Sequence, residues 1–208
     1  LLDMESDDLF LARDRIGEKP LYYGCQKGSF IFGSELKALK VHSDFENIID
    51  RNSITLQLRF SSIPAPFSIY KGVRKLLPGT YIKLSLANNN FQIENIPSPI
   101  PYWKLSNIIS EGRKNVFLGS DNEAIGQLDK LLNKSIEQQM LSDVPLGAFL
   151  SGGVDSSSIV AIMQAQSDKP IKTFTIGSDD QSYNEAKLAK LIAEYLQTDH
   201  TELYVSAQ

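Results

Sequence analysis

The chain has 208 residues, enough for one large or two small domains. Hydrophobic residues make up 42% and charged residues 22%, which is typical of a globular protein, and the net charge of −4 gives no reason to expect a nucleic-acid partner. No apolar run is long enough to cross a membrane, and one cysteine excludes an internal disulfide. The chain starts at Leu1 without a signal peptide, so we expect a segment of a longer, cytoplasmic protein.

Short apolar runs typical of strands fill the first part of the chain. They occupy residues 9–12, 21–24 and 30–33, with a turn signal at 26–29. We expect a small antiparallel meander, and because its edges would be open, it should be the end of a larger sheet. Ser34 is a candidate N-cap for the helix that follows.

The polar cluster of this region is Arg13-Asp14-Arg15. A carboxylate between two guanidinium groups should stay ionised at neutral pH. The residues alone favour a structural ion pair beside a turn, with a binding site as the alternative.

The middle of the chain alternates between expected helices and turns. Residues 50–58 predict a helix that the following prolines end, and Pro78-Gly79 predicts a turn into a strand at 81–86. Residues 88–98 are polar and turn-rich. Residues 104–120 carry charge and glycine without periodicity, which indicates a loop or linker.

A long amphipathic helix is predicted for residues 121–141, with Asp121 as its cap. Its apolar stripe is expected to lie in the core. The stripe consists of Ile125, Leu128, Leu131, Leu132, Ile136 and Met140.

Residues 144–158 predict a strand, a glycine-rich turn and a helix. Ala148-Phe149-Leu150 is the apolar run expected of a strand covered on both faces, and Ile159, Val160, Ile162 and Met163 should form the buried stripe of the helix. Residues 151–157 place backbone N–H groups and hydroxyls at the start of that helix, which is an anion site suited to phosphate.

No lysine follows the glycines, so this loop is not a Walker A loop. Phosphate would instead be held by N–H groups, by Ser151, Ser156 and Ser157, and by a metal ion. Asp155 is the natural ligand for magnesium, which combines carboxylate with phosphate oxygens. An ordinary glycine turn is the alternative.

The rest of the chain predicts a strand at 171–177, an amphipathic helix at 182–196 and a strand at 200–205. The expected apolar side of that helix consists of Ala186, Leu188, Ala189, Leu191, Ile192 and Tyr195. This order predicts a parallel α/β sheet, in which ligands bind at the carboxyl ends of the strands. Leu150 and Ile176 end strands there. His200 is expected to have a structural role.

Two distant motifs carry a family resemblance. Residues 151–157 (SGGVDSS) resemble the pyrophosphate loop of N-type ATP pyrophosphatases, and together with residues 142–147 (SDVPLG) they resemble the synthetase domain of glutamine-hydrolysing asparagine synthetases. Residues 12–23 and 34–39 resemble the end of the glutaminase domain in the same family. The resemblance covers most of the chain, more loosely between residues 85 and 140.

The resemblance implies an α/β fold. The tail of an N-terminal-nucleophile glutaminase β-sheet would be followed by a parallel-sheet ATP pyrophosphatase (adenine nucleotide α-hydrolase-like) domain, and both would be incomplete. We accordingly expect the C-terminal part of the glutamine amidotransferase domain at residues 1–85, a linker at 86–120, and the N-terminal part of the ATP-binding domain at 121–208.

The same resemblance assigns site residues. Asp14 would bind the α-amino group of glutamine through a charge-assisted hydrogen bond, and Arg13 and Arg15 would orient Asp14 or stabilise the loop. Asp155 would bind the metal. The implied ATP-binding residues are Leu150, Ser151, Gly152, Gly153, Asp155, Ser156, Ser157 and Ile176. No catalytic residue is expected in this segment, because the N-terminal cysteine nucleophile of the family is absent and Cys25 follows Gly24 in the middle of a hairpin.

The implied reaction is asparagine synthesis. ATP, with Mg²⁺, would activate aspartate as an acyl-adenylate, and ammonia from glutamine would then give asparagine, AMP, pyrophosphate and glutamate. The expected partners are the small molecules glutamine, aspartate and ATP, and a homodimer is an arrangement left open. The alternatives are a related amidotransferase acting on another carboxylate, as in surface-polysaccharide or β-lactam synthesis, and a truncated remnant without catalytic activity.

Overall fold

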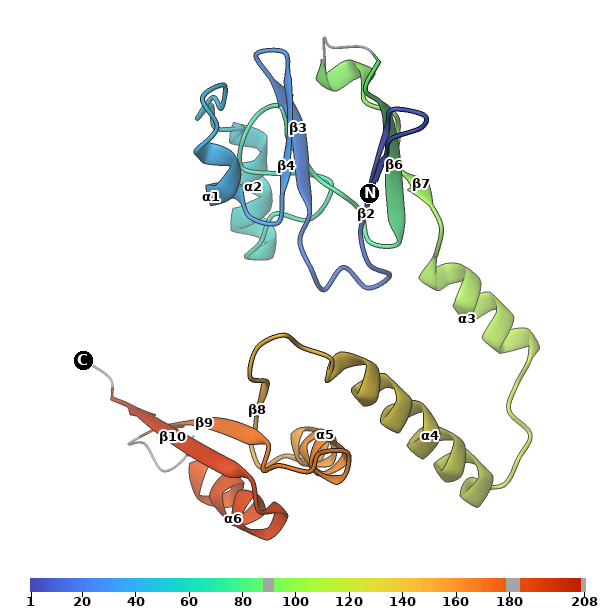
Figure 1. Cartoon of the computed structure of the whole chain (residues 1–208), viewed down its shortest axis with the longest axis vertical. Helices are drawn as coiled ribbons and strands as arrows, with labels where there is room; N and C mark the ends of the chain where they lie inside the picture. The colour runs from blue at the N-terminus through green and yellow to red at the C-terminus, as the bar shows by residue number, and fades with distance from the viewer. Residues whose placement is uncertain (88–91, 179–183, 207–208) are drawn as a thin grey trace. The chain divides into compact units, whose positions relative to one another are not determined.

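A computed structural model describes residues 1–87, 92–178 and 184–206 of the chain (Figure 1). The chain divides into two compact units, residues 1–116 and 117–208. Both combine helices with sheets, so the α/β class is confirmed. The predicted helix start at Ser182 and part of the 88–98 stretch lie outside the described residues.

The first unit contains two antiparallel sheets. One has the order β1-β2-β6-β7 and the other the order β4-β3-β5. Their strands are β1 (Leu2–Asp3), β2 (Asp8–Ala12), β3 (Tyr22–Gln26), β4 (Ser29–Gly33), β5 (Val73–Lys75), β6 (Thr80–Ser85) and β7 (Ile100–Pro101).

The predicted meander is therefore wrong, although its three strands exist. β3 and β4 form a hairpin, but β2 belongs to the other sheet and pairs with β6, which follows some 70 positions later. An apolar run identifies a strand, but its partner depends on packing between distant segments, which periodicity does not report. The two sheets face each other (Figure 1). Between them lies one core made of Leu11, Tyr23, Cys25, Leu76, Ile82, Leu84 and Ile96.

Two helices flank the β4-β3-β5 sheet on its other side, α1 (Leu36–Lys40) and α2 (Arg51–Phe60) (Figure 1). Leu39 of α1 packs against Ile31 and Val73. The N-cap of α1 is Glu35 without a side-chain bond, so the prediction that Ser34 caps this helix is wrong. A short 3₁₀ helix, η1 (Ile93–Asn95), precedes β7.

The segment predicted as a loop at 104–120 contains a helix, α3 (Leu105–Lys114). Leu105, Ile108 and Ile109 recur at helical spacing, a short pattern that the surrounding charge and glycine obscure. All three side chains are exposed, so packing against a hydrophobic core contributes little to the stability of α3.

The second unit has a parallel three-stranded sheet, as predicted. The strand order is β10-β9-β8, and helices alternate with the strands along the chain. The elements are α4 (Asp121–Gln139), β8 (Gly147–Phe149), α5 (Val154–Ala165), β9 (Lys172–Ser178), α6 (Ala186–Leu196) and β10 (Asp199–Val205).

The α4 helix begins with a capping box. The Ser120 side chain accepts from the Glu123 backbone N–H, and the Glu123 carboxylate accepts from the Ser120 backbone N–H. Ser120, not Asp121, is thus the cap. The predicted core stripe is also largely wrong, because Ile136 is buried whereas Ile125 is 64% exposed. Leu128, Leu131 and Leu132 are exposed as well.

Helices cover one face of the sheet. Leu150, Val160 of α5, and Ala189 and Ala193 of α6 form one core, and Ile136, Met163 and Ile171 form another. On the predicted apolar side of α6, Ala186 and Ala189 are buried and Ile192 is half-buried against the core, as expected. Leu188, Leu191 and Tyr195 are exposed, contrary to the prediction. Ile159 of α5 is also exposed, contrary to the prediction.

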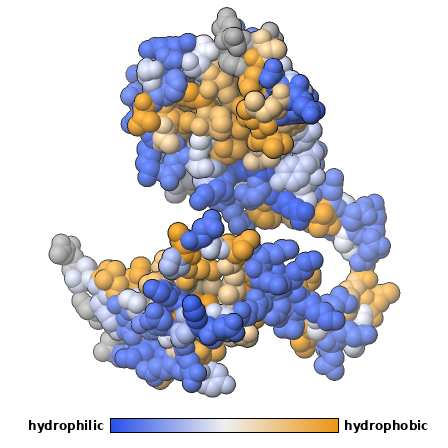
Figure 2. Space-filling view, viewed as in Figure 1, coloured by the Kyte–Doolittle hydropathy of each residue, from blue (hydrophilic) through white to orange (hydrophobic). Residues whose placement is uncertain are grey.

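Within the described residues of the second unit, the opposite face of the sheet carries exposed apolar side chains. Phe149 is 78% exposed, so the expectation that β8 is covered on both faces is wrong. Phe174 and Ile176 are exposed and alternate with buried residues along β9, and Leu203 of β10 is exposed as well. Figure 2 shows hydrophobic atoms at the surface near β9 and β10. None of the helices in the described residues is long and apolar enough to cross a membrane.

Candidate functional site

The glycine-rich turn between β8 and α5 has the geometry of a cradle. Gly152 has φ +82°, a conformation that other residues rarely adopt, and a Cβ there would lie 3.1 Å from the Ala189 backbone nitrogen. Gly153 is the N-cap of α5 and has no side chain to block the helix start. The turn therefore leaves the positive end of α5 accessible to an anion.

Three serine hydroxyls surround this helix start. Ser151 Oγ lies 2.9 Å from Ser156 Oγ, and Ser157 Oγ donates to the Gly153 carbonyl at 2.7 Å. Ser156 Oγ also accepts from the Ser151 backbone N–H at 3.3 Å. The structure thus brings the three predicted hydroxyls together. Ser151 and Ser156 are hydrogen-bonded to each other, so an anion would compete for their hydrogens.

The predicted nucleotide-contacting apolar residues flank this loop in different environments. Leu150 is 1% exposed, and its backbone N–H donates to the Phe174 carbonyl at 2.9 Å. Ile176 is 59% exposed and lies on the face of the sheet that carries exposed apolar side chains. The Ile176 side chain is accessible to a ligand, whereas the Leu150 side chain is buried. The Leu150 N–H and carbonyl both have hydrogen-bond partners within the unit.

Thr175 is a residue of the loop region that the sequence reasoning missed. Its buried hydroxyl donates to the Leu150 carbonyl and so ties β9 to the residue that enters the glycine turn. A signal existed, since Thr173 and Thr175 are polar residues at alternating positions of a strand expected to be buried.

Asp155 lies in the first turn of α5 with its side chain exposed. The described residues contain no group of three His, Cys, Asp or Glu side chains that could hold a metal ion. One carboxylate among hydroxyls nevertheless fits magnesium, which often takes one or two carboxylates and completes its shell with phosphate oxygens and water. The oxygen donor set suits Mg²⁺ bound together with a phosphate ligand.

The second candidate site is the loop that follows β2. The Asp14 carboxylate accepts hydrogen bonds from the backbone N–H groups of Gly17, Glu18 (2.9 Å) and Lys19 (3.1 Å). Burial raises the pKa of Asp14, but these N–H donors and that of Ile16 lower it by more, so the pKa lies below its ordinary value of 3.8. The carboxylate is exposed and ionised at neutral pH, which suits recognition of an ammonium group.

Arg13 stabilises this loop, which is one of the two roles that the resemblance implies for Arg13 and Arg15. Its guanidinium is buried and donates to three backbone carbonyls: Lys19 at 3.0 Å, Leu76 at 2.7 Å and Gly17 at 2.7 Å. Among the described residues, no ion pair joins Arg13 to Asp14. The prediction that Asp14 forms an ion pair with its neighbouring arginines is therefore wrong. Backbone N–H groups, not Arg13 and Arg15, keep Asp14 ionised.

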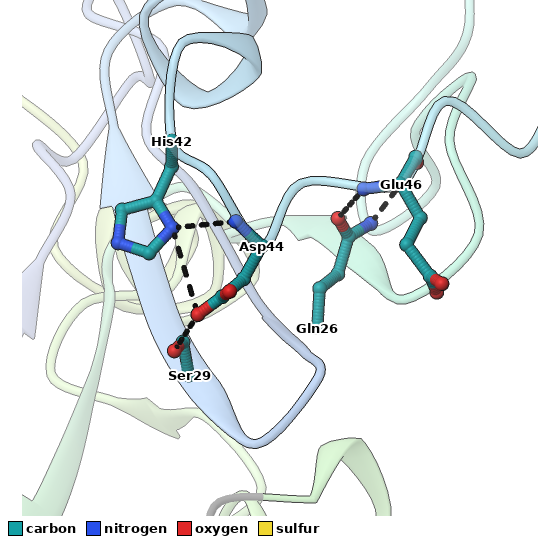
Figure 3. Close-up of polar contacts among 5 residues, drawn as sticks. All are labelled: Gln26, Ser29, His42, Asp44 and Glu46. Carbon is teal, nitrogen blue, oxygen red and sulfur yellow. Dashed lines mark hydrogen bonds and ion pairs between the residues drawn. The ribbon is translucent and has the colours of Figure 1, made fainter.

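A third polar cluster contains serine, histidine and aspartate but lacks the order of a catalytic triad (Figure 3). Ser29 Oγ donates to Asp44 Oδ2, and His42 Nδ1 lies 3.9 Å from the same oxygen. The carboxylate stands between the other two, so no imidazole is placed to deprotonate Ser29. The Gln26 side-chain oxygen accepts a hydrogen bond from the Glu46 backbone N–H. Together these contacts attach the segment after α1 to the β3–β4 hairpin.

His200 lies at the start of β10, where its Nδ1 is 2.9 Å from Thr173 Oγ1. Thr173 Oγ1 is also 2.9 Å from Thr198 Oγ1. These contacts connect two strands on the helix-covered face, which agrees with the expected structural role.

Comparison with known proteins matches both units. Residues 1–95 match the family model described as glutamine amidotransferase domain, and residues 127–208 match the model described as asparagine synthase. The two matches define a class of protein that joins an amidotransferase domain to a synthase domain in this order.

The similar curated proteins are named within one family. The chain is 31% identical to asparagine synthetase (glutamine-hydrolysing) 3 and 30% identical to asparagine synthetase (glutamine-hydrolysing) 1, both of Bacillus subtilis, over 86% and 96% of its length. It is 33% identical to a provisionally named asparagine synthetase 2 of Methanocaldococcus jannaschii over 98%. The chain belongs to the glutamine-hydrolysing asparagine synthetase family. It spans 27%, 29% and 38% of these three relatives.

Proposed function

We propose that this chain is part of an asparagine synthetase that uses glutamine as its nitrogen donor. The carboxylate of aspartate attacks the α-phosphorus of ATP, pyrophosphate leaves, and ammonia released from glutamine attacks the acyl carbon and displaces AMP. The observation that carries the proposal is the serine- and glycine-rich turn at the end of β8, which opens the positive end of α5 to an anion.

In this reaction the second unit binds the leaving pyrophosphate. Backbone N–H groups at the start of α5 and the hydroxyls of Ser151, Ser156 and Ser157 face the phosphate oxygens, and Gly152 and Gly153 let the backbone approach them. Fixed donors of this kind stabilise the charge that develops on the leaving group. Asp155 would hold Mg²⁺, which when bound neutralises part of that charge. Leu150 and Ile176 border the nucleotide.

In the first unit, the Asp14 carboxylate receives the α-ammonium group of glutamine. Three backbone N–H groups already occupy part of its acceptor capacity, which leaves a lone pair for a charge-assisted bond. Hydrolysis itself requires a nucleophile that we do not assign to any residue of this chain.

The domain assignment follows from this function. We assign residues 1–85 to the C-terminal part of an N-terminal-nucleophile glutaminase domain and 121–208 to the N-terminal part of an ATP pyrophosphatase domain, with residues 86–120 as the connection. The division of the structure between residues 116 and 117 and the limits of the two family matches support it. The cytoplasm, with its ATP and free amino acids, suits such an enzyme.

The test is Asp155→Asn in the full-length protein that contains this chain. Asp168→Asn is the matched control, because Asp168 is an exposed aspartate in the turn after α5. Wild-type protein should release pyrophosphate from ATP only when Mg²⁺ and aspartate are both present. Asp155→Asn should lower that rate by at least about 100-fold, because it removes the charge that faces the metal, whereas the control should match wild type.

Equal rates for Asp155→Asn and wild type would overturn the metal role of Asp155. Pyrophosphate release that does not depend on aspartate, in wild-type protein with ammonium salt present, would overturn asparagine synthesis as the reaction.

A further inference from the structure

The chain returns to the Asp14 loop where it leaves the β-sandwich for α3. Tyr102 directly follows β7, and its hydroxyl donates to the backbone carbonyl of Arg13 at 2.7 Å. That carbonyl belongs to the peptide group that joins Arg13 to Asp14. The Tyr102 side chain, 89 positions away in the sequence, therefore fixes the peptide group that directly precedes Asp14.

A second connection joins the same two segments through Gly79. The Gly79 N–H donates to the Asp14 carbonyl at 2.9 Å, and the Tyr102 N–H donates to the Gly79 carbonyl at 2.9 Å. Gly79 has φ +63°, and a Cβ there would lie 2.5 Å from the Trp103 carbonyl oxygen. Tyr102 is thus fixed at its backbone as well as at its hydroxyl, so its position relative to the Asp14 loop is well defined.

Packing contributes little on this side of the loop. A hollow of about 530 Å³ lies between Arg15 and Ile16 on the loop and Trp103, Lys104 and Leu105 beyond β7. Ile16 is 67% exposed. Because side chains do not fill this space, backbone position here depends on hydrogen bonds. The Tyr102 hydroxyl holds the peptide before Asp14, the Gly79 N–H holds the peptide after it, and the Arg13 N–H donates to the Thr80 carbonyl at 3.0 Å. The Arg13 guanidinium fixes the loop through other carbonyls, those of Gly17, Lys19 and Leu76.

We propose that Tyr102 is a positioning residue of the glutamine site: its hydroxyl holds the Arg13–Asp14 peptide so that the Asp14 carboxylate meets the α-ammonium group of glutamine. This inference rests on the proposed function of Asp14. Tyr102 touches neither substrate nor reacting atoms and acts through Asp14 alone. Its effect falls on glutamine binding, and the synthetase reaction with free ammonia does not depend on it.

The experiment is Tyr102→Phe in the full-length enzyme, which removes the hydroxyl and keeps the ring. Tyr81→Phe is the matched control, because Tyr81 lies in the neighbouring strand β6 and its hydroxyl has no hydrogen-bond partner within the described ranges. Asparagine formation is measured with glutamine and, separately, with ammonium chloride as nitrogen source. Tyr102→Phe should raise KM for glutamine about fivefold, the usual effect of one lost hydrogen bond, with kcat unchanged.

The ammonia-dependent rate should stay at the wild-type value in both variants. An unchanged KM for glutamine in Tyr102→Phe would overturn the inference, and so would an equal loss of the glutamine- and ammonia-dependent rates, since a general loss of folding predicts that pattern. Asp14→Asn separates the two proposals. If Asp14→Asn raises KM for glutamine strongly and Tyr102→Phe does not, only the role of Tyr102 falls. If neither variant changes KM, the glutamine-binding role of Asp14 falls as well.

Discussion

Replacing Gly152 by alanine tests the geometry of the phosphate loop directly. Gly152 has φ +82°, and the nearest atoms to an added Cβ are the Ala189 nitrogen and the Leu188 Cβ and Cγ, all at 3.1 Å. An L-residue in this conformation costs roughly 1–2 kcal/mol. The crowding adds to this cost, because the Ala189 nitrogen belongs to the backbone of α6 and cannot move without moving the helix.

We therefore expect Gly152→Ala to destabilise the loop by about 2 kcal/mol, a factor of about 30 in its population. The assay measures the thermal unfolding midpoint and the affinity for Mg²⁺-ATP of the full-length protein. Gly126→Ala is the control in the same unit. Gly126 lies inside α4, where an added Cβ meets no atom within 4 Å beyond the adjacent backbone of the helix itself, so alanine should stabilise the protein by about 1 kcal/mol.

Gly152→Ala should lower both the midpoint and the ATP affinity, while Gly126→Ala should leave ATP affinity unchanged and raise or maintain the midpoint. A Gly152→Ala protein with both properties of wild type would refute the claim that this turn requires glycine.

Two further predictions concern Thr175 and Cys25. Thr175→Val keeps the side-chain shape but removes the donor to the Leu150 carbonyl, so it should lower the free energy of unfolding by about 1–2 kcal/mol in urea titrations, and an unchanged midpoint would contradict the role of this bond. Burial, with a smaller effect of the Glu94 charge, raises the pKa of the Cys25 thiol from its ordinary 9.0 to about 11. Because the folded pKa is the higher one, this group contributes stability below pH 9 that is lost as the pH rises toward 11. At pH 8 a thiolate-directed disulfide reagent should react about 100-fold more slowly with native than with urea-unfolded protein, and similar rates would show that Cys25 is accessible.

The sequence predicted the parallel sheet of the second unit well, because each strand there is joined to the next through a helix with its own periodicity. The two sheets of the first unit were missed for the opposite reason. β2 finds its partner β6 far along the chain, and no local pattern records that pairing. The exposed stripe of α4, with Ile125 at its start, shows a related limit: periodicity reveals that a helix has an apolar side but not what covers that side.

The candidate sites follow the same division. The glycines and serines of residues 151–157 predict the backbone geometry of the phosphate loop from the sequence alone. Thr175 and Tyr102 contact the sites from distant segments, so only the structure identifies them. For Asp14, sequence adjacency suggested ion pairs with Arg13 and Arg15. The actual donors are backbone N–H groups, which every residue except proline carries, so no residue type in the sequence identifies them.

The buried guanidinium of Arg13 also has a consequence for how this loop responds to its surroundings. Arginine stays charged at every pH that a cell reaches, and its forked donors satisfy three carbonyls at once. The backbone donors hold the pKa of Asp14 below its ordinary value, so its carboxylate stays ionised near neutral pH. The charge that Asp14 presents on the loop between β2 and β3 therefore stays constant near neutral pH. Lysine could not replace Arg13 in holding this loop, because one compact ammonium group cannot reach three carbonyls that a planar fork spans.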